Sequence, residues 1–188
     1  MIDLMRVAPL HLFKQSASVQ HRHENMPVVL RTLTAQDAIF IYRYLTPPIA
    51  RNLAIDPIQN YRAAQAFALG TYTTHKARFA MVHAQYGIIG SVHYGIESDA
   101  SERSDADQYA EISYWVAAPF QRRGFTTQAL HRLFTMVKAQ GIRQATARAY
   151  LDNCPSQRLL QTVGFCLVGK RDLCGIRQVL IEFIGLIG

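Results

Sequence analysis

A strand, a glycine turn and a helix follow one another between residues 110 and 141, and this succession constrains the fold more than any other part of the chain. The run 110–116 combines apolar, aromatic and β-branched side chains in the manner of a strand, and Pro119 breaks it. Gly124 then precedes a strong helix, which Gly141 ends. The apolar side chains of that helix recur on one face: Leu130, Leu133, Phe134 and Val137.

The rest of the chain repeats these two types of element. The predicted strands cover residues 28–33, 79–84, 88–94, 110–116, 142–150, 165–170 and 176–184. Four helices are predicted. The first is short, capped by Thr34 and ended by Pro47-Pro48, and the second covers 58–72 and starts at Asp56-Pro57. The third is the helix after Gly124, and the fourth is capped by Asn153 or Cys154 and ended by Gly164. The order β-α-α-β-β-β-α-β-α-β-β predicts one mixed α/β domain over residues 28–188, with an extension at 1–27.

The composition is that of a folded, soluble protein. Hydrophobic residues make up 49% of the chain and charged residues 18%, which argues against disorder. No apolar stretch approaches the length that crosses a bilayer, so we expect no membrane partner. The first residues are interrupted by Asp3, Arg6, Pro9 and His11, unlike the apolar core of a signal peptide, and we expect a cytoplasmic protein.

Charge and metal-ligating residues narrow the possible partners. The formal net charge of +7 suits nucleic acid, a ribosomal partner or an anionic cofactor. Because the chain has no basic helical stripe with interleaved aromatic residues, we expect no direct binding of nucleic acid. The three cysteines have no CxxC spacing, and His21 and His23 have no second ligand pair. The sequence therefore predicts neither a disulfide framework nor a metal site.

The turn that opens the strong helix is the best candidate for a binding site. It reads Gln121-Arg122-Arg123-Gly124-Phe125-Thr126-Thr127. Backbone N–H groups at such a turn point outward, and together with the helix dipole they form a site for a phosphate or pyrophosphate. Gly124 lets the backbone approach the anion without a Cβ in the way, and the two arginines add positive charge. The pattern is neither a P-loop nor a dinucleotide fingerprint, and an ordinary helix start explains it equally well.

Four segments resemble the GNAT acetyltransferase family. Gln121, Gly124 and Thr126 occupy the three positions of an Arg/Gln-x-x-Gly-x-Gly/Ala pattern, which is similar to the coenzyme A pyrophosphate loop of that family, although Thr126 stands where a smaller residue is usual. Segments 30–34, 110–116 and 153–165 are similar to the branch that contains the ribosomal-protein N-terminal alanine acetyltransferases. Together the four segments span nearly all of residues 28–184 in the right order.

The resemblance implies both a fold and a co-substrate. The fold would be a central mixed, mostly antiparallel sheet that splays between its fourth and fifth strands, with helices on both faces. Acetyl-CoA would be the acetyl donor, with its pantetheine paired to free backbone groups of the fourth strand and one N–H stabilising the oxyanion. The implied cofactor-binding residues are Tyr114, Trp115, Val116, Gln121, Arg122, Arg123, Gly124, Phe125, Thr126, Thr127 and Asn153. Core packing is the alternative for the rings of Tyr114 and Trp115.

Two residues are candidates for proton transfer, which acetyl transfer needs at the amine and at the departing thiolate. Glu111 is the candidate base, acting through water, and partial burial among its strand neighbours would raise its pKa. A salt bridge or an exposed strand position is the alternative for Glu111. Ser156 is the acid implied by the resemblance, because Leu160 stands where many GNAT enzymes place a tyrosine. A first-turn hydroxyl bonded to backbone N–H groups is the alternative for Ser156.

The acceptor is expected to be an amine of a protein N-terminus or of a small molecule. The loop 97–107 carries five carboxylates against one arginine, and a negative rim would attract a cationic amine. A solvated loop without a role is the alternative. A non-catalytic acyl-CoA-binding or regulatory domain, and a ribosome- or RNA-associated module, are competing functions. The sequence is compatible with a monomer and with a homodimer.

Overall fold

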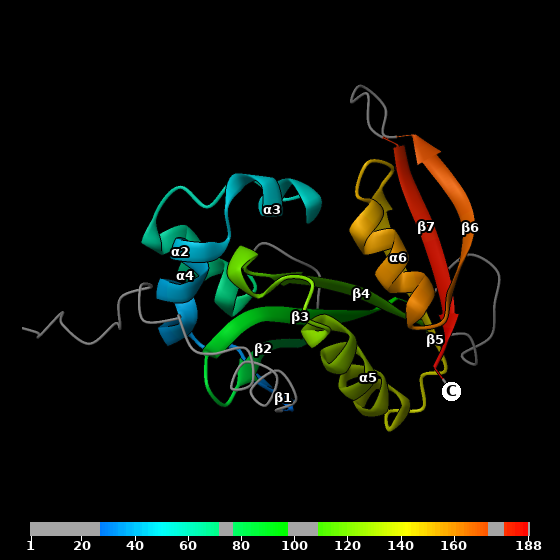
Figure 1. The fold of residues 1–188 in the computed structure, drawn as a ribbon, viewed down its shortest axis with the longest axis horizontal. Coiled ribbons are helices and arrows are strands. Elements are labelled where there is room, and N and C mark those ends of the chain that lie inside the picture. The colour runs from blue at the N-terminus through cyan, green and yellow to red at the C-terminus, as the bar shows by residue number, and fades with distance from the viewer. Residues whose placement is uncertain (1–26, 72–76, 98–108, 173–178, 188) are drawn as a thin grey trace, which may run out of the picture.

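The sheet is mixed and mostly antiparallel. The computed structural model describes residues 27–71, 77–97, 109–172 and 179–187. Within these ranges, seven strands form one sheet in the order β1-β2-β3-β4-β5-β7-β6, and only the β4–β5 pair is parallel (Figure 1). The strands are β1 (Val28–Thr32), β2 (Ala77–His83), β3 (Gly87–Glu97), β4 (Tyr109–Val116), β5 (Gln144–Tyr150), β6 (Phe165–Asp172) and β7 (Val179–Leu186). The predicted mixed α/β class is confirmed.

Helices pack on both faces of this sheet. They are η2 (Ala35–Asp37), α2 (Ala38–Tyr44), α3 (Pro47–Asn52), α4 (Tyr61–Leu69), η3 (Ala118–Phe120), α5 (Phe125–Lys138) and α6 (Cys154–Thr162). Successive strand side chains point to opposite faces, so each face has its own core. Ile112 and Val116 of β4 pack in the core that contains α5 residues and Leu160 of α6, whereas Trp115 packs in the core formed with α2, α3 and α4. The predicted placement of helices is therefore confirmed.

The sheet splits between its fourth and fifth strands. The register between β4 and β5 joins Tyr109 to Gln144 and ends where Ile112 meets Ala147. Both strands continue beyond that point, β4 to Val116 and β5 to Tyr150. The second half of β4 therefore diverges from β5, and a V-shaped gap opens between them (Figure 1). This confirms the predicted splay and positions the site described below.

Pro47 and Pro48 lie in the first turn of a helix, although the sequence pattern predicts only the end of a helix there. Helix α2 already ends at Tyr44, and Pro47 opens the short helix α3. A proline fits the first helical position because the N–H it lacks has no intrahelical partner there. The sequence pattern missed α3, which forms one wall of the pocket.

The predicted start of the next helix is wrong by several residues. Helix α4 begins at Tyr61 rather than near Asp56-Pro57, because Asn60 caps it through an Oδ1 that accepts from the N–H of Ala63 at 2.9 Å. Gly70 follows the last turn in the left-handed conformation, with φ of 84°, and ends the helix. The chain between α3 and α4 is thus a turn followed by irregular backbone.

Some predicted features lie outside the described residues. They are the extension up to residue 26, the acidic loop from residue 98 to 107, the start of the last predicted strand at 176–178, and Cys174. These features stay predictions. In the part of the chain that the structure describes, no helix combines the length and the apolar character needed to span a membrane.

Candidate functional site

The gap between β4 and β5 opens into a pocket of about 620 Å³. Its walls come from α3, the end of β4, the loop before α5, and the first turns of α5 and α6. The predicted site residues that line it are Tyr114, Trp115, Val116, Gln121, Arg122, Arg123, Gly124, Phe125, Thr126, Thr127, Asn153 and Ser156. The structure thus brings together every predicted site residue except Glu111.

The direction of the β4 backbone decides which groups face the gap. The N–H of Ala117 donates to the carbonyl of Ile89 at 2.9 Å, on the β3 side. In an antiparallel pair, residues alternate between those that bond the partner strand and those that face away from it. The N–H and C=O groups of Tyr114 and Val116 therefore face the gap, and those of Trp115 face β3.

Three predicted site residues have their side chains in a core. Trp115 is 4% exposed and its ring stacks on Phe40, with centroids 5.8 Å apart. Phe125 is 1% exposed and packs against His83, with ring centroids 5.0 Å apart. The side chain of Val116 is also buried. The core-packing alternative for Trp115 is therefore supported, and only the backbones of Val116 and Phe125 are placed to meet a ligand.

The loop before α5 contains two residues in the left-handed region. Arg122 has φ of 61° and Gly124 has φ of 75°. That conformation costs a residue with a Cβ about 1–2 kcal/mol and costs glycine almost nothing. A Cβ built on Gly124 would meet no atom within 4 Å, so the space beside it is open. Among the described residues no side chain caps α5, and the first-turn N–H groups are left for another acceptor.

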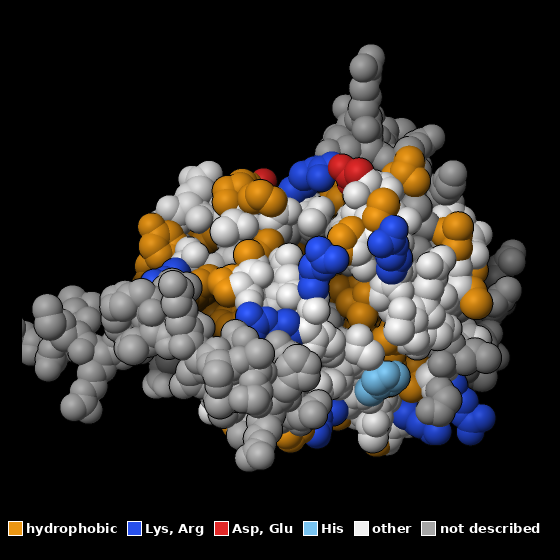
Figure 2. Space-filling view, in the orientation of Figure 1, with side chains coloured by type: hydrophobic (Ala, Val, Ile, Leu, Met, Phe, Trp, Pro, Cys, Tyr) orange, Lys and Arg blue, Asp and Glu red, His pale blue; other side chains and the backbone are white. Residues whose placement is uncertain are grey.

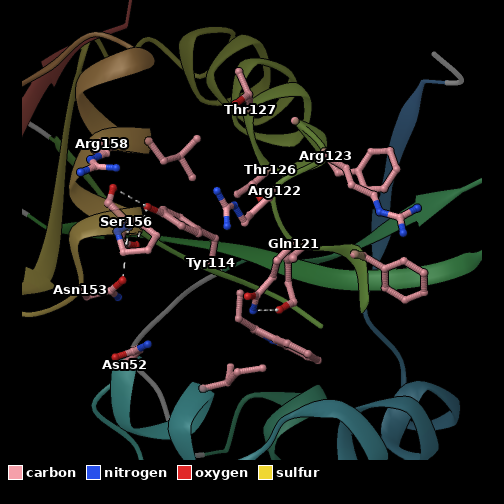
Figure 3. A pocket seen from close by; sticks show the side chains of 18 of the residues that line it. Asn52, Tyr114, Gln121, Arg122, Arg123, Thr126, Thr127, Asn153, Ser156 and Arg158 are labelled. Carbon is pink, nitrogen blue, oxygen red and sulfur yellow. Dashed lines mark hydrogen bonds between the residues drawn. The ribbon is translucent and has the colours of Figure 1, made fainter. Parts of the chain in front are cut away.

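Gln121 ties this loop to the edge of the gap. Its Nε2 donates to the carbonyl of Val116 at 3.0 Å (Figure 3). This carbonyl is one of the groups that face the gap. The amide of Gln121 therefore fixes the distance between the loop and the end of β4.

The pocket is positively charged. Arg122, Arg123 and Arg158 line it, and none of the described residues that line it is aspartate or glutamate. Figure 2 shows Lys and Arg side chains gathered around the hollow on this face. Arg123 lies at the rim, with its guanidinium carbon 5.8 Å from the ring centroid of Tyr86. The charge suits an anionic ligand such as a pyrophosphate.

The first turn of α6 forms the wall opposite β4. Asn153, and not Cys154, caps this helix, because its Oδ1 accepts from the N–H of Ser156 at 3.3 Å. The hydroxyl of Ser156 lies 2.9 Å from the hydroxyl of Tyr114 (Figure 3). The Ser156 hydroxyl is therefore bonded to a side chain across the gap and not to a backbone N–H of its own helix.

Burial changes the acidity of the Tyr114 phenol. Loss of solvent raises the pKa of Tyr114 to about 12, although the hydrogen bond with Ser156 acts in the opposite direction. The phenol is therefore neutral throughout the range in which proteins work. No sequence pattern pairs Tyr114 with Ser156, since the two are 42 residues apart.

Glu111 lies away from the pocket. It is an odd-numbered residue of β4, so it points to the face that carries Trp115 rather than to the face of Tyr114. Its Oε1 lies 3.0 Å from Nη1 of Arg148 on β5, and the two side chains are 17% and 34% exposed. The salt bridge that was the alternative to a base is thus present, and sequence reasoning missed Arg148.

The family model described as the acetyltransferase (GNAT) domain matches residues 28–166. No curated protein matches the chain significantly. Among solved structures, the chain resembles a spermidine N-acetyltransferase from Vibrio cholerae in complex with CoA and spermine, with a TM-score of 0.68, 19% identity, and coverage of 85% of this chain and 95% of that one.

Two further structures are similar. The RimL ribosomal-protein alpha-N-acetyltransferase in its apo form has a TM-score of 0.67 and 18% identity, with 85% of this chain and 90% of that chain covered. An aminoglycoside acetyltransferase in complex with coenzyme A has a TM-score of 0.68 and 15% identity, with 85% and 94% covered. At these identities the three structures show a shared fold.

Proposed function

The chain belongs to the acetyltransferase (GNAT) domain family, and from this premise we propose that it transfers an acetyl group from acetyl-CoA directly to a primary amine. One observation carries the proposal. The strained, uncapped loop from Arg122 to Gly124 and the split between β4 and β5 open on the same pocket. A ligand with a pyrophosphate at one end and an extended, amide-bearing thioester arm at the other matches such a pocket.

Each part of acetyl-CoA has a place in this proposal. The first-turn N–H groups of α5, from Phe125 to Thr127, would hold the pyrophosphate, with Arg122 and Arg123 adding charge. The gap-facing backbone groups of Tyr114 and Val116 would pair with the amides of pantetheine, as an added strand does. Asn153 would contact the arm from the opposite wall.

The proposed reaction moves two protons. The amine nitrogen attacks the carbonyl carbon of the thioester, a C–N bond forms, and the amine proton passes through water to Glu111. A gap-facing N–H of β4 stabilises the oxyanion. The C–S bond then breaks, its electron pair stays on sulfur, and the sulfur takes a proton from Ser156, which water reprotonates.

We propose a cationic acceptor. The acidic loop follows β3, which ends at Glu97, and leads into β4, where Glu111 lies near the start. The similar structures include enzymes whose names specify spermidine and an aminoglycoside, both of which carry several positive charges. A negative rim beside the base would raise the local concentration of such an amine.

Acetyl-CoA consumption over a panel of amines tests the function. The panel holds spermidine, an aminoglycoside, a basic N-terminal peptide, and a neutral peptide of the same length as the control. We expect turnover with at least one cationic amine and a lower kcat/KM with the neutral peptide. Binding of acetyl-CoA by calorimetry without turnover on any amine would instead favour the non-catalytic acyl-CoA-binding domain.

A further inference from the structure

Two hydroxyl groups meet across the gap. Tyr114 belongs to β4 and Ser156 to the first turn of α6, and their oxygens are 2.9 Å apart. The phenol oxygen also lies 3.4 Å from the backbone carbonyl oxygen of Ser156, a longer and weaker contact. Asn153 holds the Ser156 backbone N–H, so the position of Ser156 is fixed from both sides.

The direction of this hydrogen bond decides whether the hydroxyl hydrogen of Ser156 is available to a ligand. Each hydroxyl has one hydrogen, so one group donates and the other accepts. If Ser156 donated to Tyr114, its hydrogen would not be available to a ligand. If Tyr114 donates, the hydrogen of Ser156 is free for another acceptor, and Ser156 lines the pocket.

The phenol is the better donor of the two. A phenol is more acidic than an aliphatic alcohol, and its oxygen is the weaker acceptor. The phenol also keeps its hydrogen at neutral and mildly alkaline pH, because burial raises the pKa of Tyr114 to about 12. Both properties favour the arrangement in which Tyr114 donates to the Oγ of Ser156.

We propose that Tyr114 is a positioning residue for acetyl transfer: its hydroxyl donates to Oγ of Ser156 and thereby turns the hydrogen of Ser156 toward the departing sulfur. This inference rests on the proposed function, in which Ser156 protonates the thiolate. Tyr114 acts only through Ser156. Its phenol therefore affects the breaking of the C–S bond and does not affect the binding of acetyl-CoA.

A double-mutant cycle tests the inference. Tyr114→Phe removes only the phenol oxygen, Ser156→Ala removes its partner, and the two are combined. Tyr94→Phe is the matched control, because the Tyr94 hydroxyl is likewise in a short hydrogen bond, in which it accepts from Nε2 of Gln140 at 2.6 Å, but Tyr94 does not line the pocket. Melting temperatures establish that each variant is folded.

The expected result has three parts. Tyr114→Phe lowers kcat about tenfold, with KM for acetyl-CoA within about twofold of wild type. Ser156→Ala lowers kcat at least as much, and the double variant is no slower than Ser156→Ala alone. Tyr94→Phe keeps the wild-type kcat. In Ser156→Thr, which keeps a hydroxyl, Tyr114→Phe should again lower kcat.

The outcomes separate the two proposals. If Ser156→Ala is slow but Tyr114→Phe has the wild-type kcat, or if the two losses multiply in the double variant, the positioning role of Tyr114 is wrong while the acid role of Ser156 stands. If Ser156→Ala has the wild-type kcat, the acid assigned in the proposed function is wrong. If Tyr114→Phe melts early, kcat of all the variants is compared at a lower temperature at which each of them is folded, and a wild-type kcat of Tyr114→Phe there overturns the positioning role.

Discussion

Glu111 and Arg148 form an ion pair across the parallel pairing of β4 and β5, with Oε1 and Nη1 3.0 Å apart. The register sets Glu111 opposite Thr146, and Arg148 is two residues further along the same face of β5. The pair lies just before the point where the two strands separate. Glu111 is therefore held beside the point where the strands separate, on the face of β4 that carries Trp115, and the guanidinium stabilises its negative charge.

Substitutions of Glu111 and of Arg148 distinguish a role of Glu111 as the base from a purely structural role of the ion pair. Glu111→Gln removes the carboxylate and should lower kcat by about a hundredfold, with little change in acetyl-CoA affinity. Arg148→Gln breaks the same ion pair but keeps the carboxylate, so we expect it to lose less than about tenfold. Steady-state kinetics and calorimetry measure these effects. Equal losses of kcat in both variants would show that the ion pair, and not proton transfer, is what matters.

A substitution of Gly124 tests whether the loop before α5 binds the pyrophosphate of acetyl-CoA. Gly124→Val places a branched side chain beside the first-turn N–H groups of α5, and it should weaken acetyl-CoA binding at least tenfold by excluding the pyrophosphate. Gly141→Val is the matched control, because Gly141 also has a positive φ, of 86°, a Cβ added to it would meet no atom within 4 Å, and it does not line the pocket.

Both valine variants should lose stability through the same backbone strain. Only Gly124→Val should also lose affinity, which calorimetry with coenzyme A measures. Similar affinity in the two variants would place the pyrophosphate elsewhere.

The features that are predictable from sequence are local ones. The strand, loop and helix from Tyr109 to Lys138 follow from a short apolar run, one glycine and an amphipathic repeat, and the structure has them in place. Only the family resemblance predicted that one pocket would bring together Tyr114, Gln121 to Thr127, Asn153 and Ser156. Composition and periodicity could not predict this, because they carry no information on which strands separate.

The features that sequence reasoning missed depend on distant contacts. Arg148, which pairs with Glu111, is 37 positions away on another strand, and the Ser156 hydroxyl meets a side chain on β4. Helix α3 was missed because prolines are compatible with both the end and the start of a helix. The register of β4 against β5 and the packing of α6 fix where Arg148 and Ser156 lie relative to β4.

A bridge between α3 and the loop after β5 holds one side of the pocket. Nη2 of Arg51 lies 2.7 Å from Oδ2 of Asp152, and the Arg51 guanidinium carbon lies 5.2 Å from the ring centroid of Tyr150. Ile49 and Asn52 of the same helix line the pocket. Both side chains of the ion pair are largely exposed, and such pairs contribute less than about 1 kcal/mol to stability.

Arg51→Ala should therefore affect the cofactor more than the fold. We expect a change of less than about 1 kcal/mol in the free energy of unfolding. The KM for acetyl-CoA should rise about two- to fivefold, because the α3 wall loses its attachment to the opposite side of the pocket. Arg43→Ala, which removes an arginine 5.4 Å from the ring centroid of Tyr44 on α2, is the control and should leave KM unchanged. An unchanged KM in Arg51→Ala would contradict the role of the bridge.

Asp37 makes the stability of the domain dependent on pH. Its two carboxylate oxygens accept from Nη2 and Nη1 of Arg31 at 2.7 and 2.8 Å, and Oδ2 also accepts from the N–H of Thr34 at 2.8 Å. Burial by itself raises the pKa of Asp37, but the bonds from Arg31 and Thr34 together hold that pKa below its usual value. The folded state therefore prefers the charged carboxylate more than the unfolded state does.

The sign of the pH dependence follows from that preference. The stabilisation by Asp37 is fully present above the pKa of an unfolded aspartate, about 3.9, and is lost as the pH falls through the lower pKa of the folded state. Asp37→Asn should lower the free energy of unfolding by roughly 1–3 kcal/mol at pH 7, and its difference from wild type should shrink below about pH 4. Urea denaturation at a series of pH values measures this difference. Asp152→Asn, at an exposed ion pair, should cost less than about 1 kcal/mol at neutral pH. A cost of Asp37→Asn that stays constant down to about pH 2 would show that packing, and not the charge, accounts for it.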